Sequence, residues 1–339
     1  MKSFLLLVLI TFFSCSNSSD NVEIVNNNSN NTNTSLWCVP ESDIAGRGGA
    51  FEVMNDPQYK TVSEIENLGT LNDNSRLSLL NVNNEIYIYP YDYVINFEVI
   101  NDDFGDLNLA FSYCPITESA LCFNRKLSNN EVITMKASGF LFKDNLVTSD
   151  IITKYFWSQM STEGLRESSK EIRLNTYNIV ESTWGIARSF FPDALVFNHP
   201  GFDGCDCDET PIPIDFNNLF GVIHKRNVFS DIAHLFNYNN FTNGIELVYA
   251  VVNGKTAVVV GSKSKVFFNA FFNPGNLIFE ALDENDFPNV LTDNEGNIWN
   301  IFGIAVEGPR LGNKLDSPKS YVAAEWAWNA IFEDLEFYN

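Results

Sequence analysis

The chain repeats itself, and this duplication constrains its fold more than any other feature. The segments FWSQMSTEGLRESSKEIRLNTYNIVESTW and IWNIFGIAVEGPRLGNKLDSPKSYVAAEW place Trp157/Trp184 and Trp299/Trp326 at the same separation of 27 residues. Each copy continues through a short amphipathic stretch, STWGIARSFF or AEWAWNAIF, into a closing segment, DALVF or DLEFY. Self-similarity of this kind indicates homologous units. We place the two units at 77–198 and 217–339, joined by a Gly-, Pro- and Asp-rich loop at 199–216.

Most segments inside each unit alternate with a period of two. NEIYIYP, LNLAFSY, SALCFNR and EVITMKASG are rich in aromatic and β-branched residues and are bounded by Asn, Asp and Gly, which is typical of strands. A helical period of 3.6 occurs only near Trp184 and Trp326. The pattern predicts an α+β, β-dominated fold in which two homologous β-rich units pack pseudo-symmetrically, each with a short amphipathic helix near its C-terminal end. Residues 36–76 are expected to pack on the first unit.

The first residues indicate an exported lipoprotein. Lys2 precedes an apolar run from Phe4 to Phe13, followed by Ser14 and Cys15, and this run is too short to span a membrane. We expect 1–14 to be a signal peptide, Cys15 to carry the lipid, and the Asn/Ser-rich segment 15–35 to be a disordered tether. Ser16 rather than Asp after the Cys favours the outer membrane of a Gram-negative bacterium. The sequence does not indicate which face of that membrane the protein occupies.

Charge and cysteine content exclude several classes of protein. The chain has 43 Asp and Glu against 21 Lys and Arg, a formal net charge of −22, which argues against nucleic acid as a partner. The Cys and His spacings match no structural zinc site, and we expect no metal and no cofactor. The exported compartment permits disulfides, but the pairing stays open among the five remaining cysteines, which are Cys38, Cys114, Cys122, Cys205 and Cys207.

Four segments, in order, carry a family resemblance. They are WCVPESDIAGRGGAFEVMNDPQYKTVSEI, YIYPYDYVINFEVINDDFGD, YCPITESALCFNR and SGFLFKDNLVTSDIITKYFWSQ. Together they resemble a bacterial domain-of-unknown-function family (three-one-seven-nine), whose pattern runs Tyr-Pro, Trp-His-Glu-x-x-Asn-Asp, Tyr-Cys-Pro-Leu-Cys, and Ser-Gly with Asp and Trp-x-Gln downstream. The resemblance implies an architecture but no activity.

The family pattern transfers only in part. Its matched positions are Glu98, Asn101, Asp102, Tyr113, Cys114, Pro115, Ser138, Gly139, Asp150, Trp157 and Gln159. The family's His falls on Phe97 and its second Cys on Thr117, so this chain lacks the imidazole and the thiol that would make Cys114 a dithiol or an activated nucleophile. A disulfide from Cys114 to Cys122 across one turn, buried free thiols, and retained thiol chemistry remain the alternatives.

These observations predict a lipid-anchored surface protein that binds a small ligand or an envelope protein, without catalysis. The binding candidates are Glu98, Asn101, Asp102, Tyr113, Cys114, Ser138, Asp150, Trp157 and Gln159. One alternative is an envelope enzyme of unknown reaction that uses Cys114 with nearby carboxylates. Another is a structural or assembly subunit whose aromatic residues serve only the core.

Overall fold

The structure, a computed structural model, describes residues 36–49, 51–199, 215–227, 229–275 and 277–338. Residues 36–339 form one compact unit. The expected signal peptide, the lipid-bearing Cys15, the tether, and Cys205 and Cys207 lie outside the described residues. No helix in the described part of the chain is both long and apolar enough to cross a membrane.

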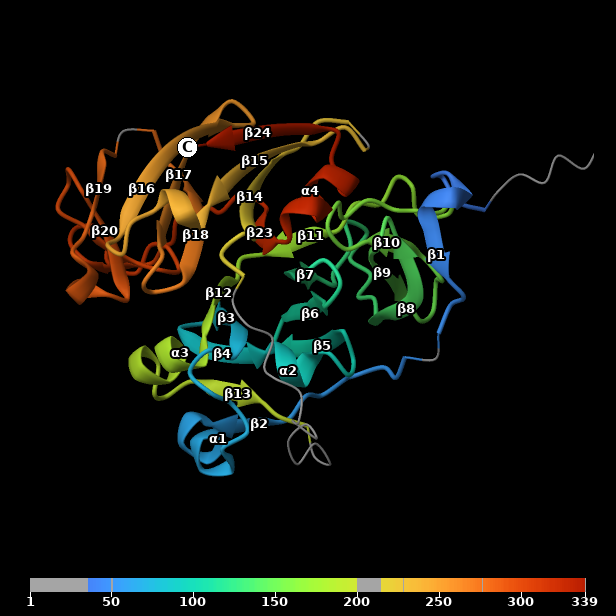
Figure 1. The fold of residues 1–339 in the computed structure, drawn as a ribbon, viewed down its shortest axis with the longest axis horizontal. Helices are drawn as coiled ribbons and strands as arrows, with labels where there is room; N and C mark the ends of the chain where they lie inside the picture. Colours follow the sequence, from blue (N-terminus) through green and yellow to red (C-terminus); the bar gives the residue numbers. More distant parts are fainter. Residues whose placement is uncertain (1–35, 50, 200–214, 228, 276, 339) are drawn as a thin grey trace, which may run out of the picture. The chain divides into compact units, whose positions relative to one another are not determined.

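The first part of the chain contributes three sheets (Figure 1). Its strands are β1 (Ile44–Gly46), β2 (Tyr59–Thr61), β3 (Arg76–Val82), β4 (Glu85–Pro90), β5 (Val99–Phe104), β6 (Leu107–Cys114), β7 (Ser119–Asn124), β8 (Met135–Phe142), β9 (Asn145–Asp150), β10 (Phe156–Ser158), β11 (Asn175–Tyr177), β12 (Val180–Thr183) and β13 (Leu195–Phe197). The strand orders are β12-β3-β4-β13-β2, β11-β7-β6-β5 and β1-β8-β9-β10. Strands β1 and β2 therefore attach residues 36–76 to the first repeat.

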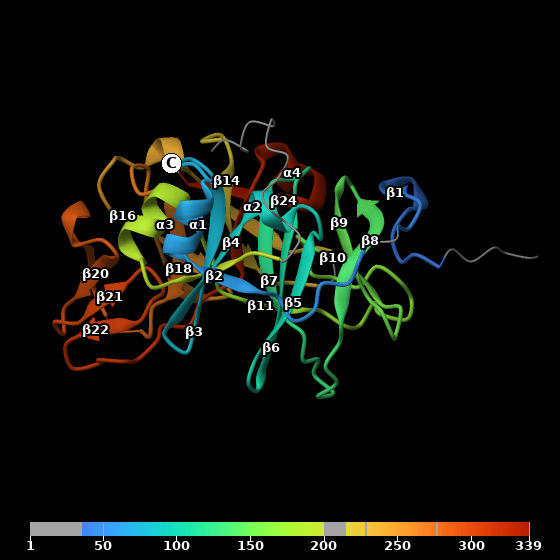
Figure 2. The same cartoon turned by 90° about the horizontal axis from the view of Figure 1, so that it is seen from below.

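The second part of the chain contributes three more sheets. Its strands are β14 (Leu219–His224), β15 (Ile232–Asn237), β16 (Glu246–Val252), β17 (Lys255–Ser262), β18 (Phe267–Phe272), β19 (Phe279–Ala281), β20 (Asn289–Asp293), β21 (Ile298–Asn300), β22 (Ala305–Glu307), β23 (Ser320–Ala323) and β24 (Asp334–Tyr338). The strand orders are β23-β14-β15-β24, β16-β17-β18 and β19-β20-β21-β22. The β8–β10 and β19–β22 sheets lie at opposite ends of the compact unit (Figures 1 and 2).

The helices in the described residues are short. They are α1 (Val62–Leu68), α2 (Tyr91–Val94), α3 (Trp184–Phe190) and α4 (Glu325–Ile331), with 3₁₀ turns at Glu41–Asp43, Tyr238–Asn240 and Glu284–Asp286. The β-dominated α+β class is confirmed, and α3 and α4 are the two predicted amphipathic helices. Helix α1 begins with a capping box, in which Thr61 and Glu64 bond each other's backbone N–H.

The two halves repeat one strand order. In the first, β12 is antiparallel to β3, β3 to β4, and β13 is parallel to β4. In the second, β23, β14, β15 and β24 have the same relations. The order β7-β6-β5 likewise corresponds to β18-β17-β16. Strand β7 contacts β23, and β12 contacts β18, as a two-fold arrangement would require. The pseudo-symmetric packing itself stays a prediction, which a superposition tests.

The tryptophans of the repeat lie on corresponding elements but not in identical environments. Trp157 is in β10 and Trp299 in β21, and both are buried. Trp184 opens α3 and is buried, whereas Trp326, the second residue of α4, is 45 % exposed. The buried indole of α4 is Trp328. It packs so closely on Gly221 that a Cβ there would lie 2.2 Å from its ring.

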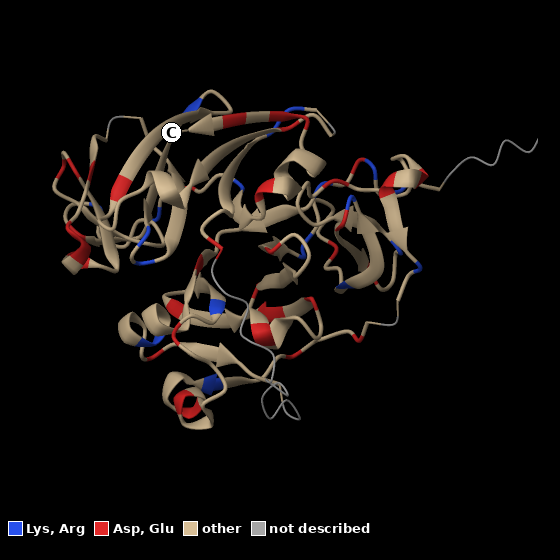
Figure 3. Ribbon diagram, in the orientation of Figure 1, with Lys and Arg blue, Asp and Glu red and all other residues tan. Residues whose placement is uncertain are grey.

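Two of the three hydrophobic clusters draw on both repeats. One joins β3–β7 to residues of β17, β18 and β21, and another joins β6–β10 to β14, β15, β23 and α4. The third lies within the second repeat. Acidic residues are spread over loops, strands and helices of both repeats, interspersed with Lys and Arg (Figure 3). The shared clusters explain why the two repeats form one compact unit.

Candidate functional site

Cys114 and Gln159, two of the predicted binding residues, meet in one buried polar network. The network consists of Cys114, Thr117, Ser119, Asn145 and Gln159. Ser119 Oγ and Asn145 Nδ2 donate to Gln159 Oε1 at 2.7 and 2.9 Å, and Asn145 Nδ2 also donates to Thr117 Oγ1 at 2.9 Å. Gln159 Nε2 in turn donates to the carbonyl oxygen of Ser119 at 3.1 Å. These bonds hold the β6–β7 turn against β9 and the segment after β10.

The thiol of Cys114 is poorly suited to chemistry in this network. Burial raises its pKa, and hydrogen bonds from Thr117 and from the backbone of Leu146 and Ile116 only partly offset that effect. The thiolate is the reactive form of cysteine. Thr117 stands at the position of the family's second Cys and contributes a hydroxyl instead of a second thiol. Cys114 is therefore held mainly as a neutral thiol.

Cys114 and Cys122 are on opposite faces of the β6–β7 hairpin. In the antiparallel register Cys114 pairs with Ser119 and Cys122 with Phe111. Paired residues share a face of the sheet and successive residues alternate faces. Because Cys122 is three positions from Ser119, its side chain lies on the face opposite to that of Cys114. Cys122 packs in the first hydrophobic cluster and Cys114 in the second, and both are free. The alternative of a disulfide between them is wrong.

Four other predicted residues organise backbone. Asn101 Nδ2 donates to the carbonyl oxygens of Met54 and Met135 at 3.0 and 2.7 Å. Ser138 Oγ accepts from Phe140 N at 3.1 Å. The carboxylate of Asp150 accepts backbone N–H bonds within the turn after β9. The indole N–H of Trp157 donates to a backbone carbonyl oxygen 2.9 Å away. Each of these side chains is engaged in a hydrogen bond that holds the backbone, which favours a structural role.

Asp102 and Tyr113 lie in an aromatic layer of the first repeat. Asp102 accepts a short hydrogen bond from Tyr59 and one of 3.2 Å from Tyr89, and its pKa is raised, chiefly by burial. The ring of Tyr113 stacks on Tyr91 at 4.1 Å. The hydroxyl of Tyr113 is buried without a hydrogen-bond partner among the described residues.

Glu98 differs from the other predicted residues, because its carboxyl has no hydrogen-bond or ion-pair partner in the described part of the chain. It is half-buried, has a left-handed backbone with φ of 56°, and burial raises its pKa to about 7. A cleft of about 450 Å³ next to it is lined by Phe51, Glu52, Asn96 and Phe97. The last two stand where the family has Trp and His.

A buried ion cluster joins the repeats and was not predicted from the sequence. Arg76, which is 1 % exposed, donates to both oxygens of Glu181 at 3.2 Å and makes a short ion pair with Glu118 Oε2. Tyr91 donates to Glu181 Oε2 at 2.8 Å. Asn218, from the second repeat, donates to Glu118 Oε2 at 2.8 Å. Arg76 and Glu181 are 105 residues apart, so no local pattern could reveal the pair.

The electrostatics of this cluster keep the guanidinium charged. Burial is the largest single effect on Arg76 and would lower its pKa, but Glu181 and the other acidic groups around it together outweigh burial, and the pKa is raised. Glu118 Oε2 is engaged by Arg76 and Asn218, whereas no described residue bonds Oε1. Glu118 also has a left-handed backbone, with φ of 51°, a conformation that costs about 1–3 kcal/mol and often marks functional positions.

Glu118 faces a cleft between the repeats, which we call the junction cleft. Its volume is about 400 Å³. It is lined by Glu118, Asp215, Asn217, Asn218, Ala324, Glu325, Trp326 and Asn329. Three of these are carboxylates, three are amides, and Trp326 presents an exposed indole. Such a surface can accept hydrogen bonds and pack against one flat apolar face of a ligand. In the described residues, no group of three or more His, Cys, Asp or Glu is placed to hold a metal ion.

The fold and this cleft define a β-rich protein whose two halves share a strand order and meet at a polar cleft. Residues 52–212 match the family described as "Protein of unknown function (DUF3179)", and this segment of the chain belongs to that family. No curated protein and no solved structure matches the chain. The matched segment contains Glu118, whereas the Asn218 and α4 side of the junction cleft comes from beyond it.

Proposed function

We propose that the chain is a lipid-anchored extracytoplasmic protein that binds a small polar ligand in the junction cleft and does not catalyse a reaction. The observation that carries this proposal is the fixed carboxylate of Glu118. One of its oxygens is held by a buried arginine and an amide, no described residue bonds the other, and Glu118 lines the cleft together with Trp326. A group positioned before the ligand arrives loses little freedom on binding.

The lining of the cleft indicates the kind of ligand. Carboxylate and amide oxygens accept hydrogen bonds, and an exposed indole packs on the apolar face of a sugar ring or attracts an ammonium group. A neutral sugar or a small amine therefore suits the cleft better than an anion, which would meet the carboxylates of Glu118, Asp215 and Glu325.

The absence of catalysis is proposed from the state of Cys114. Its sulfur is buried, its pKa is raised by that burial, and Phe97 replaces the family's His. An enzyme that used this thiol would need a base to form the thiolate. Glu98 is the remaining candidate acid or base, with a pKa of about 7, but it is absent from the lining of the junction cleft.

Binding is tested by calorimetric titration of the purified full chain with neutral hexoses and with primary amines. We expect one of these two classes to bind saturably, and Trp326→Ala to weaken that binding about tenfold or more, the equivalent of about 1.4 kcal/mol. Ile152→Ala removes an exposed apolar residue outside the cleft and should bind like the wild type. Failure of both classes to bind, or equal affinity for Trp326→Ala, would refute the proposed cleft.

Anchoring is tested separately at Cys15. We expect mass spectrometry of the mature N-terminus to show an acylated Cys15, and we expect Cys15→Ala to release the protein from the outer membrane fraction. Cys38→Ala, which removes an exposed free cysteine, should stay in that fraction. A soluble wild-type protein whose mature N-terminus is a residue other than Cys15 would contradict the proposed lipid anchor.

A further inference from the structure

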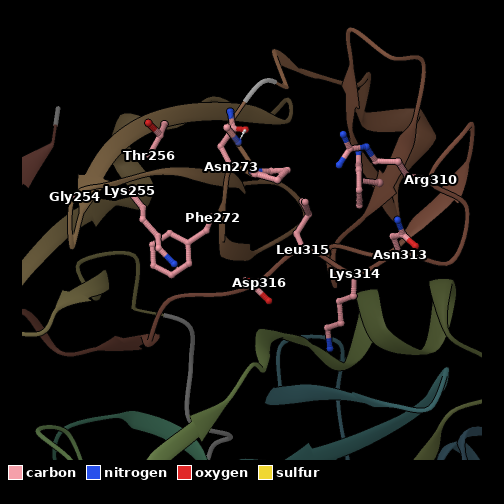
Figure 4. Close-up of a pocket in the computed structure, with 13 residues that line it drawn as sticks. Gly254, Lys255, Thr256, Phe272, Asn273, Arg310, Asn313, Lys314, Leu315 and Asp316 are labelled. Carbon is pink, nitrogen blue, oxygen red and sulfur yellow. Dashed lines mark hydrogen bonds between the residues drawn. The ribbon is translucent and has the colours of Figure 1, made fainter.

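The second repeat contains a separate pocket of about 720 Å³ (Figure 4). Its walls are the turn into β17, the end of β18 with the loop that follows, Trp299 of β21, and the loop before β23. The volume falls within the roughly 300–1,000 Å³ that small-molecule sites occupy. The pocket shares no lining residue with the junction cleft.

The pocket gathers positive charge in an acidic chain. Lys255, Arg310 and Lys314 line it, and Asp316 is the single carboxylate among its described lining residues. Arg310 is paired in two bonds with Glu295, at 2.7 and 3.0 Å. Because the whole chain has 43 acidic and 21 basic residues, a lining with this excess of cations runs against its composition.

The two lysines rest on aromatic rings instead of carboxylates. Lys255 Nζ lies 5.1 Å from the ring centre of Phe272, and Lys314 Nζ lies 5.1 Å from that of Tyr177. Neither amine forms an ion pair within the described residues. A cation held over a ring face is kept in place while its positive charge stays available to an incoming anion.

The pocket also presents polar side chains that are not used internally. Asn273 is used: its Nδ2 donates to the carbonyl oxygen of Leu277 at 2.7 Å and its Oδ1 accepts from Gly275 N at 3.0 Å, which fixes that wall. In contrast, the side chains of Thr256 and Asn313 bond no other described residue. Figure 4 shows Arg310 and Asn313 together on one side of the pocket and Lys255 on the other.

We infer that this pocket binds a small hydroxylated organic anion. Its carboxylate or phosphate group would be attracted by Lys255 and Lys314 and by the donor of Arg310 that Glu295 leaves free. Its hydroxyl groups would bond Thr256 and Asn313. This site goes beyond the proposed function, because it has the opposite charge preference and its lining residues all come from the second repeat.

The test is calorimetric titration of the full chain with galacturonate and glucose 6-phosphate, each compared with its neutral sugar, galactose or glucose. We expect at least one anion to bind saturably, about tenfold or more tightly than its neutral counterpart, and to weaken as salt concentration rises. The double variant Lys255→Gln/Lys314→Gln should lose about tenfold or more in that affinity.

The matched control is Lys143→Gln. Lys143 Nζ lies 5.4 Å from the ring centre of Phe142 in the first repeat, so the variant removes the same kind of contact away from the pocket and should bind the anion normally. Trp326→Ala should also bind it normally, which separates this site from the junction cleft. The inference is overturned if neither anion binds saturably, if the neutral sugars bind as well, or if the double variant matches Lys143→Gln.

Discussion

At the scale of single residues, Cys114 is predicted to be an unreactive structural thiol. Burial raises its pKa, so at neutral pH the thiolate is scarcer than in free cysteine, whose pKa is about 8.5. We expect native labelling with a thiol reagent, followed by mass spectrometry, to modify exposed Cys38 long before Cys114. Cys114→Ser should cost about 1–3 kcal/mol of unfolding free energy. Labelling of Cys114 faster than free cysteine would establish an activated thiolate and favour an enzyme.

Glu98 is predicted to make the folded protein less stable as the pH rises. Burial raises its pKa from 4.5 to about 7, so the folded state favours the protonated acid. Between these pH values the unfolded chain releases a proton that the folded chain retains, and stability falls as pH rises. We expect Glu98→Gln to match the wild type near pH 4 and to be more stable by about 1–2 kcal/mol at pH 8, after allowing for solvent screening.

Urea unfolding across this pH range checks the Glu98 prediction. Glu52→Gln is the matched control, because Glu52 lines the adjacent cleft but is exposed, and its curve should follow that of the wild type. If Glu98→Gln shows the wild-type pH dependence, then Glu98 ionises normally in the folded state.

At the scale of elements, the Ser-Gly motif is explained by backbone geometry. Gly139 has φ of +77°, lies where the β8–β9 register shifts, and approaches Gly49 so closely that a Cβ would be 1.9 Å from its nitrogen. Gly105 has a similar φ of +66° with nothing within 4 Å. Alanine should cost about 1–2 kcal/mol at Gly105 for the left-handed backbone, and at Gly139 about 1–3 kcal/mol more for overpacking.

Thermal or urea unfolding of Gly139→Ala and Gly105→Ala measures that difference. Equal losses of unfolding free energy would mean that the segment around Gly49 moves aside, and that Gly139 is needed only for its φ.

The sequence revealed those elements whose signals are local. Alternation of period two gave the β-rich class, and the 3.6 period gave α3 and α4. It did not single out α1, although Thr61 and Glu64 form a capping box that the pattern Thr-x-x-Glu could have indicated. Trp326 was matched by spacing, yet α4 buries Trp328, because a helix can turn either of two nearby indoles toward its neighbours.

The candidate site could be predicted only in part, because the sequence shows local patterns and not the contacts between distant residues. Motif residues such as Asn101 and Gln159 are recognisable in sequence, but whether they bind a ligand or hold backbone depends on partners far along the chain. Glu118 and Arg76 gave no sequence signal, since their importance comes from a contact between the β6–β7 turn and the start of β3. Long-range charge pairs of this kind are visible only once the fold is known.

At the scale of the whole molecule, the two repeats are joined by a buried lysine. Lys319, at the entry to β23, donates from Nζ to the carbonyl oxygens of Ser161 and Met160 at 2.8 and 3.2 Å and to Thr162 Oγ1 at 3.4 Å. It thereby ties the second repeat to the segment that follows Gln159. Burial lowers its pKa from 10.5 to about 7, with Asp231 raising it and Arg173 and Lys225 lowering it further.

This lysine predicts a rise in stability with pH above neutrality, opposite in sign to the effect of Glu98. Between pH 7 and 10.5 the unfolded chain keeps a proton that the folded chain has released, so the unfolding free energy increases, by at most about 1.4 kcal/mol per pH unit. We expect urea unfolding between pH 7 and 10 to show this slope in the wild type and a flatter one in Lys319→Met. Lys255→Met, which changes an exposed lysine, should keep the wild-type slope. If Lys319→Met keeps it as well, Lys319 stays protonated where it joins the repeats, and its three oxygen acceptors outweigh the cost of burying its charge.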